Sequence, residues 1–166
     1  MPLPEYVIAV GEVYTAAGRA VEAQQQFDLA RAMERLYLAN GVDTDLEMAL
    51  FAADQPQGHS PGEAIARARR ALEKRPTIYA ADALAWALYR DGRYAQAYAY
   101  SQQALRLGTQ DALFLLHAGM IAHRLGRAGE ARAYLERALS VNPYFSVRYA
   151  DVAVETLASL DVETKQ

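Results

Sequence analysis

Histidines and carboxylates are the side chains of this sequence that could carry metal or acid–base chemistry. The three histidines are His59, His117 and His123. A spacing of six residues places His117 and His123 on different faces of a helix, so the two rings do not converge on one metal ion. The 166 residues contain no cysteine, which excludes a disulfide framework, a thiolate metal site and a cysteine nucleophile. We therefore expect no metal and no cofactor.

Catalytic motifs are missing from the sequence. It contains no Gly-rich phosphate loop, no G-x-S-x-G nucleophile turn and no His-Glu-x-x-His helix. The carboxylates of Asp82, Asp91 and Asp111 fall at predicted helix starts or corners, where aspartate has a structural role. We predict that the protein is not an enzyme. The weakly supported enzymatic alternative would need a concave site with strongly perturbed ionisable groups.

Charge and hydropathy restrict the partners. The net charge is −3 and the isoelectric point is near 5.6, which gives no electrostatic reason to expect nucleic acid or an anionic membrane as a partner. Glutamates interrupt the basic run Arg67, Arg69, Arg70, Lys74 and Arg75, which favours a solvated helix face over a phosphate-binding strip. The longest apolar run, residues 112–125, is too short to span a bilayer and contains charge.

An internal repeat organises the chain. Two alanines stand seven residues apart four times, and the pairs recur at intervals of 41, 33 and 34 residues. A Gly-Arg dipeptide precedes three of the pairs at a constant offset. The alanine pairs are Ala23/Ala30, Ala64/Ala71, Ala97/Ala104 and Ala131/Ala138, and the dipeptides begin at Gly18, Gly92 and Gly126. A glycine that ends one helix, followed by small residues on one face of the next, predicts helix pairs joined at tight corners.

This repeat resembles the tetratricopeptide repeat, whose pattern places Leu-Gly, Tyr, Ala, Phe, Ala and Pro at fixed offsets. The fourth unit matches best, with Ala118-Gly119, Gly126, Ala131, Leu135, Ala138 and Pro143. The resemblance covers residues 4–143 and implies an all-α fold, a right-handed α-solenoid of about four helix-turn-helix repeats. The implied repeats are approximately residues 4–40, 44–77, 78–111 and 112–145, followed by a capping helix over residues 144–160, in a single domain 1–166.

Local signals refine the helix boundaries. The second helix of the first unit continues to Ala39 and stops at Asn40-Gly41, which accounts for the 41-residue interval. Capping boxes at residues 44–47 and 60–63 predict two further helix starts, the second with Pro61 at the first helical position.

The resemblance also implies where a partner binds, because the first helices of tetratricopeptide units line a concave surface that binds peptides or helices. The site residues assigned by register are Tyr79, Asp82, Trp86, Tyr89, Arg90, Leu113, Leu116, Met120, His123 and Arg124. The first unit would add Glu5, Ile8, Glu12 and Thr15, and the C-terminal helix would add Val147, Ala150 and Val154.

Two orientations of Trp86 stay open at this point. Leu84 and Ala85 fill the core places of its helix, which leaves the indole facing the groove, where tryptophan is a typical binding residue. Alternatively, Trp86, Tyr89, Leu116 and Met120 pack against one another or under the terminal helix. One subclass of the family grips chaperone C-termini with Lys and Asn. Here those places hold Ile8, Glu12, Leu50, Tyr79 and Ala83, so we do not expect that ligand.

The functional prediction is therefore a scaffold that binds a protein or peptide of unknown identity in its concave groove. The alternative is a structural one. The repeat pattern is running by Val10-Gly11 with no capping helix ahead of it and no signal sequence before Glu5, as in an excised C-terminal part of a longer bacterial tetratricopeptide protein. On that interpretation the N-terminal end continues a solenoid or forms a homodimer. Localisation is not predicted.

Overall fold

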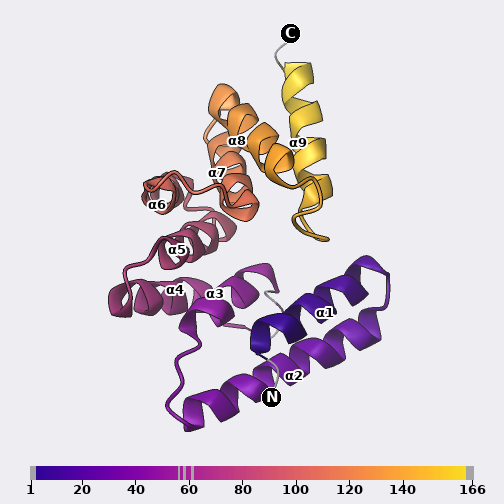
Figure 1. Cartoon of the computed structure of the whole chain (residues 1–166), viewed down its shortest axis with the longest axis vertical. Helices are drawn as coiled ribbons and strands as arrows, with labels where there is room; N and C mark the ends of the chain where they lie inside the picture. Colours follow the sequence, from indigo (N-terminus) through magenta and orange to yellow (C-terminus); the bar gives the residue numbers. More distant parts are fainter. Residues whose placement is uncertain (1–2, 56, 58, 61, 164–166) are drawn as a thin grey trace.

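The computed structural model describes residues 3–55, 57, 59–60 and 62–163, and within these residues it contains nine α-helices and no β-strand (Figure 1). The all-α prediction is confirmed. The helices are α1 (Pro4–Ala16), α2 (Ala20–Ala39), α3 (Asp45–Asp54), α4 (Glu63–Lys74), α5 (Ile78–Arg90), α6 (Tyr94–Leu105), α7 (Ala112–Arg124), α8 (Ala128–Val141) and α9 (Ala150–Glu163).

Successive helices pair into hairpins that follow one another along the molecule. The hairpins are α1–α2, α3–α4, α5–α6 and α7–α8, and α9 packs against α8 at the C-terminal end (Figure 1). The first helices of neighbouring hairpins also contact one another, α1 with α3, α3 with α5 and α5 with α7. Each hairpin thus buries its apolar side against its neighbours, and the result is an α-solenoid.

Glycines in the left-handed region end the first helices of three hairpins, as the Gly-Arg dipeptides predicted. Gly18, Gly92 and Gly126 have φ of +72°, +81° and +71°. In each case the following arginine N–H donates to a carbonyl five residues back, at 2.8 to 3.0 Å. This Schellman arrangement satisfies carbonyls that the helix end leaves free, and it turns the chain into the second helix.

Small residues hold the two helices of a hairpin close together. A Cβ atom added to Gly119 on α7 would lie 2.7 Å from the Leu135 Cγ on α8 and 3.3 Å from the Ala131 carbonyl oxygen. A Cβ on Gly11 of α1 would lie 2.4 Å from the Phe27 ring on α2. Ala131 itself is completely buried. The glycine and alanine positions of the repeat are therefore contact points where a larger side chain would not fit.

Several helix boundaries follow the sequence signals and others do not. Helix α2 does extend to Ala39, and Gly41 follows with φ of +72°. The predicted cap at Thr44 is wrong: its hydroxyl is buried without a hydrogen-bond partner among the described residues, and the Asp43 carboxylate instead accepts from the Asp45 N–H at 2.9 Å. The second capping box is half formed, because Glu63 accepts from the Ser60 N–H at 3.0 Å. Pro61 lies outside the described residues.

The C-terminal helix starts later than predicted. Helix α9 begins at Ala150 rather than Tyr144, because polar side chains fold the preceding residues into turns. The Asn142 Oδ1 accepts from the Tyr144 N–H at 2.9 Å, and the Ser146 hydroxyl accepts from the N–H groups of Arg148 and Tyr149 at 3.2 Å. These turns bring Arg148 and Tyr149 back towards the middle of the solenoid.

Candidate interaction surface on the concave face

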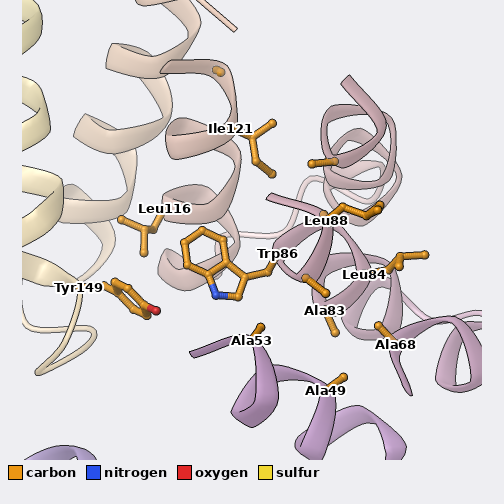
Figure 2. Close-up of a cluster of buried hydrophobic side chains, with 14 of the residues drawn as sticks. Ala49, Ala53, Ala68, Ala83, Leu84, Trp86, Leu88, Leu116, Ile121 and Tyr149 are labelled. Atoms are coloured by element: carbon orange, nitrogen blue, oxygen red, sulfur yellow. The ribbon is translucent and has the colours of Figure 1, made fainter. Parts of the chain in front are cut away.

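Trp86 lies in the interior of the solenoid, where Figure 2 shows it between α3, α7 and the segment before α9. Its side chain is 2% exposed. The indole stacks on the Tyr89 ring at 4.7 Å and on the His117 ring at 4.1 Å, and the Tyr149 ring meets it edge-on at 5.5 Å. The interpretation that the indole faces an open groove is therefore wrong, because the segment before α9 covers it.

Asp54, at the C-terminal end of α3, collects the polar groups around Trp86. The Trp86 Nε1–H donates to the Asp54 Oδ1 at 2.7 Å, and the Tyr149 hydroxyl donates to the same oxygen. The Arg148 guanidinium donates to the Asp54 carbonyl at 2.6 Å, and Arg90 lies 3.8 Å from the carboxylate. We call Asp54, Trp86, Arg148 and Tyr149 the C-terminal clasp. Its hydrogen bonds from Arg148 and Tyr149 to Asp54 join residues that are 94 and 95 positions apart in the sequence. None of these three residues was among the site residues predicted from the sequence.

Electrostatics at the clasp fit its polar contacts. Burial raises the pKa of the Tyr149 hydroxyl, and the negative charge of Asp54 and the hydrogen bond to it raise that pKa further. The tyrosine therefore stays a neutral donor, which suits an acceptor carboxylate. The positive charges of Arg90 and Arg148 act against this rise.

The other residues predicted from the register separate into an interior and an exposed group. Asp82 and Leu116 are buried, and a hydrogen bond of 2.9 Å joins the Asp82 Oδ2 to the His117 Nδ1. Tyr79 is exposed, with its ring edge-on to Phe114, and Arg124 is exposed and donates to the Tyr94 hydroxyl at 2.8 Å. The remaining members, Tyr89, Leu113, Met120 and His123, are partly buried, and Arg90 is exposed. The predicted residues thus do not form one continuous surface.

An open hollow does lie on the concave side, next to the clasp. It has a volume of about 270 Å³ and is formed by α1, α3 and α7, and we call it the α1–α3–α7 groove. Its lining residues are Glu5, Ile8, Ala9 and Glu12 of α1, Glu47, Leu50, Phe51 and Asp54 of α3, and Leu113 and His117 of α7. A neighbouring hollow of about 350 Å³ shares Glu12 and is lined by Thr15, Ala16, Gln55, Val147 and Arg148 as well.

Carboxylates surround the apolar floor of this groove. Burial raises the pKa of Glu12, the Asp54 charge raises it further, and Arg148 acts in the opposite direction. Within the described residues, no hydrogen bond or ion pair joins Glu5, Glu12 or Glu47 to another side chain. His117 is 1% exposed, and its Nδ1 is hydrogen-bonded to Asp82. Its other ring nitrogen, Nε2, is not used in that hydrogen bond.

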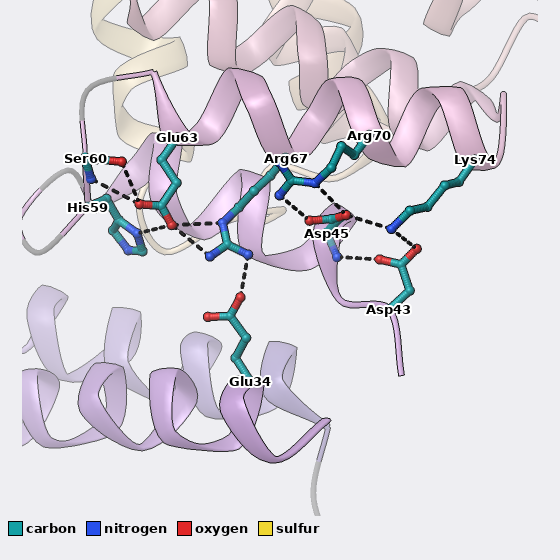
Figure 3. Close-up of polar contacts among 9 residues, drawn as sticks. All are labelled: Glu34, Asp43, Asp45, His59, Ser60, Glu63, Arg67, Arg70 and Lys74. Atoms are coloured by element: carbon teal, nitrogen blue, oxygen red, sulfur yellow. Dashed lines mark hydrogen bonds and ion pairs between the residues drawn. The ribbon is translucent and has the colours of Figure 1, made fainter. Parts of the chain in front are cut away.

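Most of the basic run on α4 is exposed, as the sequence predicted, although three of its members also form ion pairs. Figure 3 shows Arg67 between Glu34 of α2 and Glu63 of α4, and it shows Arg70 and Lys74 directed at Asp45 and Asp43. Arg70 donates to Asp45 at 2.7 Å, and Lys74 donates to it at 3.0 Å. Arg67 therefore connects the second hairpin to the first through Glu34, whereas Arg70 and Lys74 pair with carboxylates at the start of the second hairpin.

The Glu63 carboxylate shows how strongly this network favours charge. Burial raises its pKa, but hydrogen bonds from the Ser60 N–H, Arg67 and His59 outweigh burial and lower the pKa to about 2. The Glu63 carboxylate thus stays ionised and paired with Arg67.

The described part of the chain contains no metal-binding cluster and no helix suited to cross a membrane. No group of three or more histidines and carboxylates in it is arranged to hold a metal ion. None of its helices has the length and apolar character needed to cross a membrane.

Comparison with known proteins agrees with the repeat pattern. Residues 58–138 match the family model of the anaphase-promoting complex, cyclosome, subunit 3, a model of tetratricopeptide-type repeats. No curated protein sequence matches the chain significantly. Among solved structures, MamA AMB-1 P212121 is similar with a TM-score of 0.48 and 17% sequence identity, over 98% of this chain and 88% of that chain. The repeat period and the helical hairpins together show an α-solenoid, and residues 58–138 are similar to a family model of tetratricopeptide-type repeats.

Proposed function

We propose that this protein is a non-catalytic scaffold that binds a segment of another protein in the α1–α3–α7 groove. The groove itself is the observation that carries the proposal. It is a hollow of about 270 Å³ with an apolar floor, and it is open on the concave side. Leu50 and Leu113 in this floor are only partly buried. Exposed apolar side chains gathered in a hollow are typical of interaction sites.

The proposed site lies closer to the N-terminus than the register suggested. The third unit contributes Trp86 to the interior, where Tyr149 already covers the indole. The first, second and fourth units keep their first helices accessible at the groove, through Ile8, Leu50 and Leu113. A partner segment that lies across these three helices would contact three separate hairpins, and its binding would depend on how the hairpins are arranged.

Blocking the groove is expected to abolish partner binding. Ala9 is exposed and lines the groove, so Ala9→Tyr fills the hollow without disturbing buried residues. Peptides would be selected from a displayed random library on the immobilised wild-type domain, and their affinities for the variant would be measured by fluorescence polarisation. We expect a loss of about tenfold or more.

The matched control is Ala133→Tyr, the same substitution at an exposed alanine on α8 that does not line the groove. It should leave the affinity of the selected peptides unchanged. Peptides that bind Ala9→Tyr as tightly as wild type would refute groove binding.

A second candidate function is self-association, which the outer face of α1 favours. Tyr6 is 64% exposed, and Val10 and Val13 are also exposed and follow it at helical spacing. On this proposal two copies of the chain bury these stripes against each other. Sedimentation equilibrium should then show a dimer at micromolar concentrations that Val10→Glu dissociates and that Leu107→Glu, at an exposed turn residue, does not. A wild-type monomer at 100 µM, about a hundredfold above such a dissociation constant, would exclude it.

A further inference from the structure

We propose, on the basis of the function above, that the α1–α3–α7 groove selects a partner segment that presents a lysine or arginine side chain between apolar residues. The groove would thus recognise a cationic and apolar motif of a protein, rather than the chaperone C-terminus that one subclass of the tetratricopeptide family grips.

The groove contains carboxylates that have no hydrogen-bond or ion-pair partner among the described residues. Glu5, Glu12 and Glu47 line it, and within the described residues they make no hydrogen bond or ion pair. Nearby carboxylates of the same two hairpins behave differently. Glu34, Asp45 and Glu63 are each paired with an arginine (Figure 3). Among the described residues, three of the four carboxylates that line the groove therefore lack an ion-pair partner, and only Asp54 has one.

Two arginines beside the groove, Arg90 and Arg148, already contact Asp54. Arg148 donates to the Asp54 carbonyl at 2.6 Å, and Arg90 lies 3.8 Å from the Asp54 carboxylate. Arg148 partly offsets the charge of Glu12, but the lining also contains Glu5 and Glu47, so the groove keeps an excess of negative charge. An anionic segment would be repelled there, whereas a cationic one would meet complementary charge.

Glu12 of α1 is partly buried and lines a hollow together with the segment before α9. An ion pair formed in such a place is less screened by water than one on an open surface. Burial and the neighbouring Asp54 charge both disfavour the ionised form of Glu12 in the free protein. A ligand cation would relieve this unfavourable interaction, so the protein gains more from a cation here than at an exposed glutamate.

The floor of the groove suits the apolar stem of a cationic side chain. Ile8, Leu50 and Leu113 form an apolar surface beside the carboxylates. Lysine and arginine have long apolar stems below their charged ends, and such stems pack on apolar surface while the charge reaches a carboxylate. His117 adds a polar group to the floor, because Asp82 holds its Nδ1 and leaves Nε2 for a hydrogen bond to a ligand.

The test uses three capped peptides that differ only in their central residue: Ala-Leu-Arg-Leu-Ala, the same peptide with citrulline, and the same peptide with glutamate. Citrulline keeps the shape of arginine without its charge. Each is titrated to millimolar concentration into the ¹⁵N-labelled full chain, and amide shifts are followed by NMR. We expect the arginine peptide to shift the amides of groove residues, citrulline to bind about fivefold more weakly, and the glutamate peptide to bind least.

A charge-removing variant makes the test specific. Glu12→Gln should lower the affinity for the arginine peptide to that for the citrulline peptide and leave citrulline binding unchanged. Glu136→Gln, at an exposed glutamate on α8 outside the groove, should change neither affinity.

The outcomes separate this inference from the proposed function. Equal affinities of all three peptides, with shifts at the groove, would refute cation selection and leave groove binding intact. Groove amides that none of the peptides shifts would also refute cation selection, and the library selection with Ala9→Tyr then decides groove binding by itself. Selected library peptides that lack lysine and arginine would have the same meaning.

Discussion

Replacing Trp86 with alanine is expected to lower the free energy of unfolding by about 3 to 5 kcal/mol, the range for large aromatic side chains deleted from a packed interior. The indole is almost completely buried and contacts rings from three parts of the chain, Tyr89, His117 and Tyr149. Its removal would leave a cavity, and the Asp54 carboxylate would lose a hydrogen-bond donor. Urea unfolding followed by circular dichroism at 222 nm would measure the change.

Two controls separate the packing of the indole from its hydrogen bond. Trp86→Phe keeps a ring in the stack but loses the Nε1–H donor, so its effect should be clearly smaller than that of alanine. Tyr144→Ala removes an aromatic side chain that is 88% exposed and should have little effect on the unfolding midpoint. If Trp86→Ala unfolded at the same urea concentration as Tyr144→Ala, the buried position of the indole would be contradicted.

The sequence predicted the features that depend on a few neighbouring residues. A glycine at the end of a helix needs only its own left-handed backbone and one following N–H, so Gly18, Gly92 and Gly126 could be assigned as corners. The alanine pairs mark the close contacts between helices because no larger side chain fits there, as the distances at Gly119 show for its own hairpin. Periodicity alone therefore determined the helix pairs.

Contacts between distant parts of the chain could not be predicted in the same way. The register separates Trp86 from the core places of its helix, whereas the indole is buried in the same cluster as Leu84 and Ala85 because another segment covers it. That depends on turns at Asn142 and Ser146, which return Tyr149 to Asp54, 95 residues earlier. A single carboxylate at a helix end gives no sequence signal for such a role.

The groove was predicted in part. The register placed Glu5, Ile8 and Glu12 on the inner wall and included Leu113, and all four line the groove. It centred the site on the third unit, however, because Trp86 dominates that helix in the sequence. The same limit explains the basic run on α4. The sequence predicted its exposed face but not its ion pairs, because the carboxylates that pair with Arg67 and Arg70 lie 33 and 25 residues earlier.

Replacing Asp54 with alanine is expected to lower the free energy of unfolding by about 2 to 3 kcal/mol, because two largely buried donors would lose their shared acceptor. The Trp86 Nε1–H and the Tyr149 hydroxyl both donate to its carboxylate. The loss should be concentrated at the C-terminal end, since Tyr149 directly precedes α9. Hydrogen exchange measured by mass spectrometry should show faster exchange in residues 148–160 and unchanged exchange in α2.

The matched control is Asp28→Ala, which removes an exposed aspartate whose partner, Arg31, lies on the same helix, and which should leave both measurements unchanged. A double-mutant cycle then tests the contact itself. If the indole donates to Asp54, the effects of Asp54→Ala and Trp86→Phe will not add, since either change breaks the same hydrogen bond. Additive effects would contradict the hydrogen bond between the indole and Asp54, and exchange that rises equally in α2 and α9 would show that Asp54 does not hold the C-terminal segment against the concave wall.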